Sequence, residues 1–124
     1  RSVLLMYAEA CNELGESREA LDKLEMVRAR ARRTVHPADM TVGLPEITET
    51  GKEKLREIIW NERRIELALE GHRFFDLIRA DKVVPGYAEK MMKAHGKTNF
   101  SIAKHATFFI PQKQVDISQG VLKN

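Results

Sequence analysis

The sequence predicts a mainly α-helical fold, in which a helical hairpin is followed by further helices and one short extended or β segment near the C-terminus. Three observations predict it. Apolar residues recur every three or four positions through most of the chain, which is the helical period. Glycine or proline separates the periodic stretches. Only residues 106–110 form a β-branched and aromatic run, and a proline follows it.

The composition is that of a folded segment. The 124 residues are 43% hydrophobic and 31% charged, which fits one domain with one core. The charge of +3, from 21 Lys and Arg against 18 Asp and Glu, does not favour a nucleic-acid partner. The densest basic run lies at a predicted helix end, where cations complement the helix dipole. It consists of Arg28, Arg30, Arg32 and Arg33.

Residues 2–14 and 17–33 are predicted to form two helices that reverse direction at Gly15. Ser17 is placed to cap the second helix. So short a connection forces an antiparallel hairpin. The single cysteine, Cys11, excludes an internal disulfide and is expected to be buried. The expected inner residues are Leu4, Tyr7, Ala8, Cys11 and Leu14 in the first helix, and Ala20, Leu21, Leu24, Val27 and Ala31 in the second.

A loop over residues 34–49 is followed by a long helix. Residues 50–53, Thr-Gly-Lys-Glu, fit a capping box at its start. Gly71 is expected to end or bend this helix before a shorter one over residues 74–79. The core stripe of the long helix is expected to be Leu55, Ile58, Ile59, Ile65 and Leu69.

Pro85 favours a helix over residues 86–95, which Gly96 would end. The extended segment over residues 106–110 comes next, before a polar tail over residues 112–124. Expected buried residues are Tyr87, Met91 and Met92, the phenylalanines Phe74, Phe75, Phe108 and Phe109, and, as anchors of the tail, Val115, Ile117, Val121 and Leu122.

Three glutamates define the most unusual stretch. Glu62, Glu66 and Glu70 are four apart, so they stack on one side of a helix that overlaps its apolar stripe. Partly buried carboxylates need cationic partners, because an unpaired one costs several kcal/mol. We therefore predict a structural ion-pair network that joins the long helix to the short helix and to the hairpin. Its members are Glu62, Arg63, Glu66, Glu70, Arg73, Asp76 and Arg79.

The same carboxylates, with His72, could form a metal site or a general acid/base pair. A helical di-metal site needs Glu-x-x-His, and Leu69 stands where that glutamate would be. The surplus of arginines also favours charge pairing over metal binding. None of His36, His72, His95 and His105 has a partner at zinc-ligand spacing. We predict no catalytic residue, no metal site and, without a phosphate loop or nucleophile elbow, no cofactor.

Three motifs carry a family resemblance. Residues 4–15, LLMYAEACNELG, with Ala20 and Leu21 and with VRARA at 27–31, resemble one tetratricopeptide repeat. They also resemble the tetratricopeptide-like part of the SusD/RagB family. Residues 61–79, NERRIELALEGHRFFDLIR, are similar to that family's most recognisable signature, and residues 109–117, FIPQKQVDI, to its closing motif. The resemblance covers nearly the whole chain.

The resemblance implies a C-terminal helical region, residues 1–124, of a longer SusD/RagB-like protein, with a tetratricopeptide-like hairpin over residues 1–33. It implies a non-enzymatic lipoprotein on the extracellular face of the outer membrane of Bacteroidetes-type bacteria. Its implied partners are a TonB-dependent SusC-like channel and an oligosaccharide or peptide ligand. The lipid anchor and the family's final Pro-Gly-Tyr are absent from these residues, as expected of a trimmed fragment.

The ligand contacts of this family come largely from regions outside such a segment, so this segment is expected to be mainly scaffold. Trp60 is the one candidate for a ligand contact, because sugars stack on exposed aromatic rings. Its position beside Ile58 and Ile59 favours a core role instead. Two other functions stay open: a tetratricopeptide-like adaptor that binds a protein, and a helical glycosidase that uses Glu62 or Glu66.

Overall fold

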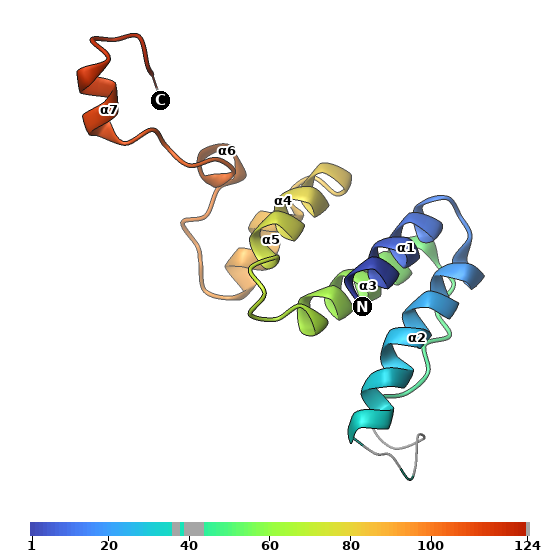
Figure 1. Ribbon diagram of the computed structural model, residues 1–124. Helices are drawn as coiled ribbons and strands as arrows, with labels where there is room; N and C mark the ends of the chain where they lie inside the picture. Colours follow the sequence, from blue (N-terminus) through green and yellow to red (C-terminus); the bar gives the residue numbers. More distant parts are fainter. Residues whose placement is uncertain (36–37, 39–43, 124) are drawn as a thin grey trace. The chain divides into compact units, whose positions relative to one another are not determined.

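The computed structural model describes residues 1–35, 38 and 44–123, and the helices among them account for the fold (Figure 1). They divide between two compact units, Arg1–Arg73 and Phe74–Asn124. The mainly helical class is confirmed, and no strand occurs in the described part of the chain. The helices are α1 Ser2–Glu13, α2 Ser17–Val35, α3 Lys52–Glu66, α4 Arg73–Val83, α5 Tyr87–Ala94, α6 Ile102–His105 and α7 Gln112–Ile117.

Helices α1 and α2 form the predicted antiparallel hairpin (Figure 1). Gly15 makes the reversal possible, because its φ of +85° is a left-handed conformation that residues with a Cβ rarely adopt. The amide of Glu16 then donates to the carbonyl of Cys11 at 2.8 Å and closes the end of α1. Helix α3 packs against this hairpin, mainly against α1. The shared core consists of Leu5, Ala8, Cys11, Ala20, Leu24, Val27, Leu55 and Ile59.

Some hairpin details differ from the prediction. Leu14 is 77% exposed and Tyr7 is about half exposed. The core includes Leu5, which was not predicted, beside the predicted Ala8 and Cys11. Ser17 is the first residue of α2, and its hydroxyl donates to the carbonyl of Thr50 at 3.1 Å. Ser17 therefore ties the start of α2 to the segment before α3.

The start of α3 has no capping box. Gly51 is the residue before the helix, and no side chain caps it. Instead, the carboxylate of Glu49, two residues earlier, accepts a hydrogen bond from the backbone amide of Gly51 at 2.7 Å. Of the predicted loop, residues 34 and 35 belong to α2 and residues 44–50 are irregular, whereas 36–37 and 39–43 lie outside the described residues.

The end of α3 comes earlier than predicted. The helix stops at Glu66, and Leu69 and Gly71 take positive φ values of 67° and 77° in the turn that follows. The helical spacing is therefore lost beyond Glu66, and Leu69 is fully exposed. Ile65 is also exposed, and Leu67 is buried in its place. The core prediction for Ile65 and Leu69 was wrong, whereas Leu55 and Ile59 have no exposed surface.

The second unit contains α5, α6, α7 and nearly all of α4. Gly96, with a φ of +79°, follows the end of α5 as predicted. Helices α6 and α7 were not predicted, since each is only four to six residues long and shows too few turns for a period. Between them, residues 106–111 are irregular. A strand needs a neighbouring strand, and no second β-type run exists in this sequence.

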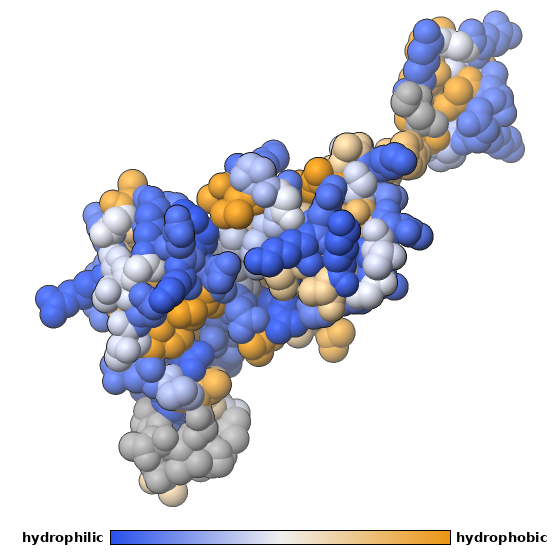
Figure 2. All heavy atoms as spheres, turned by 180° about the vertical axis from the view of Figure 1, so that it is seen from behind, coloured by the Kyte–Doolittle hydropathy of each residue, from blue (hydrophilic) through white to orange (hydrophobic). Residues whose placement is uncertain are grey.

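Several aromatic residues of this unit were wrongly predicted to be buried. Phe75, Phe108 and Phe109 are 69%, 95% and 64% exposed. A unit this small buries few residues, and only Leu77, Ala80 and Ala88 reach full burial among those described. Phe74, Tyr87, Met91, Met92 and Val115 are half-buried, and Ile117, Val121 and Leu122 are exposed. Apolar side chains accordingly interrupt the polar surface (Figure 2).

Candidate functional site

The strongest concentration of buried charge lies where α3 meets the hairpin in the first unit. Glu9 of α1, Arg28 of α2, and Glu62 and Arg63 of α3 are each 5–8% exposed. Charged groups at this depth are stable only with hydrogen-bonding partners of opposite charge. Their arrangement is therefore the candidate site.

Glu62 and Arg28 form the innermost ion pair. The carboxylate Oε2 of Glu62 lies 2.7 Å from Nη1 of Arg28, and both side chains are at most 10% exposed. The other guanidinium nitrogen, Nη2, donates to the carbonyl of Pro45 at 2.9 Å. Arg28 thus links α2 to α3 and to the segment that leads into it. The arginine run is more than a complement to the helix dipole, because Arg32 also donates to a loop carbonyl, that of Leu44.

The other two glutamates of the ladder also pair with the hairpin. Glu66 lies 2.9 Å from Nη2 of Arg30, and Glu70 pairs with Arg1. The Glu66 side chain is 11% exposed but Arg30 is 56% exposed, so this pair lies at the edge of the core. Sequence reasoning did not name Arg1, Arg28 or Arg30 as partners, because 34 to 69 residues separate them from the glutamates.

The remaining members of the predicted network lie as follows. Arg63 is buried in α3, Arg73 begins α4, and Asp76 and Arg79 lie one turn apart in α4 with 3.3 Å between Oδ1 and Nη2. That last contact is a partly exposed pair within a single helix, which contributes little. A link between α3 and α4 through these residues stays a prediction.

Trp60 lies in the same buried region. Its indole Nε1–H donates to Oε1 of Glu9 at 2.8 Å, and only 5% of its surface is exposed. The guanidinium carbon of Arg56 lies 6.0 Å from the ring centroid. No broad face of the indole is open for a sugar to stack on, which fits the core alternative. The sequence analysis did not identify Glu9. Its position on the same side of the helix as Leu5, Ala8 and Asn12 was the available signal.

A second charged contact joins α1 to the first turns of α3. Both oxygens of Glu13 accept from Arg56, at 2.5 and 2.8 Å, and Lys52 donates to the carbonyl of Glu13 at 2.6 Å. The hydrogen bond from Arg56 lowers the pKa of Glu13 below its ordinary value, against a smaller opposing effect of burial. Beside it, the fully buried Asn12 donates to the carbonyl of Lys52 at 2.9 Å. Sequence reasoning missed all of these.

The chemistry of the site is that of a brace. Its carboxylates contact guanidinium or indole donors from other helices, and these contacts hold the helices together. Within the described residues, no group of three or more His, Cys, Asp or Glu side chains is placed to hold a metal ion. His72, His95 and His105 are exposed, and His36 lies outside the described residues. Among the described helices, none has the length and apolar character of a membrane span.

Comparisons with known proteins agree with the motifs. The model of the SusD family matches residues 2–124. SusD-like protein P38 of Formosa agariphila is 37% identical over 83 residues, which are 66% of this chain and 16% of that protein. SusD-like protein P2 of the same organism is 41% identical over 81 residues, 62% of this chain and 15% of that protein. No solved structure matches significantly. With the family model covering nearly its whole length, the chain belongs to the SusD family.

Proposed function

We propose that the chain is part of a nutrient-binding component of an outer-membrane uptake system, in which these residues are mainly scaffold. The matched segment makes up about a sixth of each curated relative, so most of such a protein is not represented here. One observation carries the scaffold role: the Arg28–Glu62 pair at the centre of the signature stretch is buried and satisfied by another helix. The signature thus holds α3 to the hairpin.

The finer part of the proposal is a glycan ligand, with peptide as the second possibility, and a SusC-like TonB-dependent channel as partner. The protein would be lipid-anchored on the extracellular face of the outer membrane. Family membership and the absence of an open aromatic platform at Trp60 support a division of labour, in which ligand contacts come from other parts of the protein.

The test uses the protein at its native length and an oligosaccharide array, with product analysis by mass spectrometry. We expect an oligosaccharide to be bound and recovered uncleaved, and Glu66→Gln to bind it with unchanged affinity. Circular dichroism checks that the variant is folded. Cleaved products that disappear in Glu66→Gln would establish the glycosidase alternative and overturn the proposal.

A tetratricopeptide-like adaptor is the second candidate, and one observation favours it. Val3 and Met6 of α1 and Leu14, which directly follows α1, are 71%, 51% and 77% exposed and lie on the side opposite the core. Such a face fits a neighbouring helix or a protein partner. Cell fractionation separates the two candidates: recovery in the outer-membrane fraction supports nutrient capture, and recovery in the cytoplasm supports the adaptor.

A further inference from the structure

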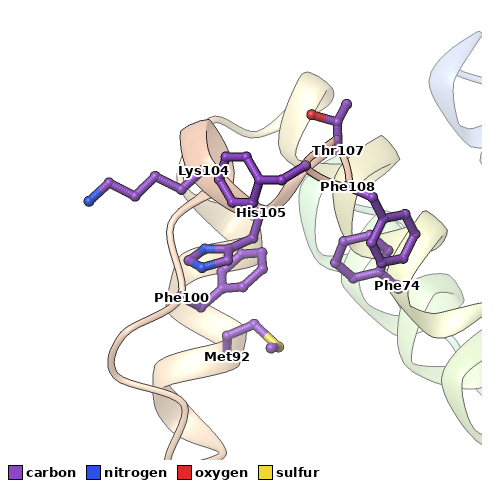
Figure 3. Close-up of a pocket in the computed structure, with 8 residues that line it drawn as sticks. Phe74, Met92, Phe100, Lys104, His105, Thr107 and Phe108 are labelled. Atoms are coloured by element: carbon purple, nitrogen blue, oxygen red, sulfur yellow. The ribbon is translucent and has the colours of Figure 1, made fainter. Parts of the chain in front are cut away.

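The second unit contains an apolar pocket that the ion-pair site does not involve (Figure 3). Its volume is about 360 Å³, in the lower part of the range of ligand pockets. Its walls are almost entirely carbon. They are formed chiefly by Phe74, Met92, Phe100, His105, Phe108 and Phe109.

The walls are held by specific contacts. The ring of His105 stacks on that of Phe100, with centroids 5.5 Å apart, as Figure 3 shows, and Phe74 meets Phe100 edge-on at 6.5 Å. Nδ1 of His105 lies 3.0 Å from both the amide nitrogen and the carbonyl oxygen of Ser101, which orients the imidazole. Phe108 and Phe109 are left largely exposed beside this cluster. The pocket therefore has a fixed aromatic wall and an open rim.

The unit that contains the pocket has a net positive charge. The second unit has eight Lys and Arg against four Asp and Glu, a surplus of four. None of its seven lysines takes part in an ion pair in the described part of the chain. Two of the acids, Asp81 and Glu89, accept backbone amides at the starts of α5 and α6. Lys104 lines the pocket itself. The apolar pocket thus belongs to a unit of net positive charge and has one lysine, Lys104, in its lining.

We propose that this pocket binds an apolar side chain from an acidic peptide segment of a partner protein. Burial of an aromatic or aliphatic side chain against Phe74, Phe100 and His105 supplies affinity. Carboxylates beside that side chain meet Lys104, which supplies orientation, and the net positive charge of the unit favours a faster encounter. An oligosaccharide fits less well, since its hydroxyl groups need hydrogen-bonding partners that a carbon-lined wall lacks.

The test measures binding of a fluorescein-labelled pentapeptide, Asp-Glu-Phe-Glu-Asp, to the protein at its native length by fluorescence polarisation at low salt. Matched probes replace the four acids by lysine or the central phenylalanine by alanine. We expect binding of the acidic phenylalanine peptide and a loss of about tenfold or more with either change.

Two pairs of variants locate the binding. Lys104→Glu is expected to weaken it about threefold to tenfold, and Lys113→Glu, the same charge reversal in α7, to leave it nearly unchanged. Phe108→Ala is expected to weaken it about tenfold, with Ile117→Ala, exposed to 64%, as the control. Phe108 and Lys104 are both exposed, so neither change should unfold the unit.

Three results would overturn the proposal: equal binding of the acidic and basic peptides, equal effects of the pocket and control variants, or displacement of the peptide by an oligosaccharide. Binding to residues 1–124 alone, with none to the protein at native length, would also overturn it. That result would mean that another part of the same polypeptide fills the pocket.

Discussion

The buried pair of Arg28 and Glu62 gives the sharpest test of the brace. Arg28→Ala removes the guanidinium and leaves the carboxylate of Glu62, whose side chain is 7% exposed, without that partner. Removal of one member of a buried ion pair costs about 3–5 kcal/mol. The variant also loses the hydrogen bond to Pro45. We therefore expect the free energy of unfolding at pH 7 to fall by about 3–5 kcal/mol.

Urea unfolding followed by Trp60 fluorescence measures this change, because the single tryptophan is buried in the unit that contains the pair. Arg30→Ala is the matched control. It removes the same kind of partner from Glu66, but Arg30 is 56% exposed, so the expected loss is about 0.2–1 kcal/mol. The double variant Arg28→Met, Glu62→Leu removes both charges and should recover most of the loss.

Equal losses for Arg28→Ala and Arg30→Ala would refute the reasoning, because the burial of Arg28 and its hydrogen bond to Pro45 should make its removal the costlier of the two. A loss below about 1 kcal/mol for Arg28→Ala would show that water or another cation compensates the carboxylate. A double variant as unstable as Arg28→Ala would place the cost in packing and not in an unpaired charge.

Two further changes test neighbouring contacts. Trp60→Phe removes the indole donor to the buried carboxylate of Glu9, so the free energy of unfolding should fall by about 1.5–3 kcal/mol. Circular dichroism during urea unfolding measures this change, and an unchanged midpoint would contradict the hydrogen bond. Glu13→Gln should cost about 0.5–1 kcal/mol at pH 7, since Glu13 is a third exposed. Arg56 lowers the pKa of Glu13 in the folded state, so this contribution is complete above the unfolded pKa of about 4.3 and disappears as the pH falls through the lower folded pKa. A difference between wild type and Glu13→Gln that persists at pH 2 would refute the assignment.

Local patterns in the sequence were sufficient for the first unit's helices. The spacing of Ala8 and Cys11, and later of Leu55 and Ile59, reflects the helical period directly, and these predicted core residues are buried. Leu5 is buried as well, although Leu4 was predicted in its place. The positions of the helix ends depend on contacts with residues far away in the sequence, so local patterns predicted them less well. Gly71 was expected to end or bend the long helix, but the helix already ends at Glu66, five residues earlier, and the positive φ of Leu69 has no signal in residue type.

The second unit was less predictable for a physical reason. Helices of four to six residues show little more than one turn of any pattern, and their formation depends on contacts that a short window does not contain. The aromatic residues 108 and 109 were assigned to a strand and a core, because hydrophobicity favours burial in general. Their exposure beside Phe100 and His105 is a property of tertiary structure, which no spacing rule provides.

The acidic ladder shows where sequence reasoning ends. Spacing by four correctly indicated that Glu62 and Glu66 share a side of α3 near the core, and from this it followed that cations must accompany them. Glu70 does not follow this spacing, because it lies beyond the end of α3 in an exposed turn. The sequence analysis favoured arginines close in sequence as partners, since only their positions relative to the glutamates could be predicted. The structure shows Arg1, Arg28 and Arg30, each from the hairpin, as partners. The pairs of Glu62 with Arg28 and of Glu66 with Arg30 fix the position of α3 along α2, because a shift by one residue would separate both pairs at once. Exchanging the two charges of the more exposed Arg30–Glu66 pair should therefore be tolerated. The same exchange in the buried Arg28–Glu62 pair should be tolerated only if the hydrogen bond to the carbonyl of Pro45 is also restored.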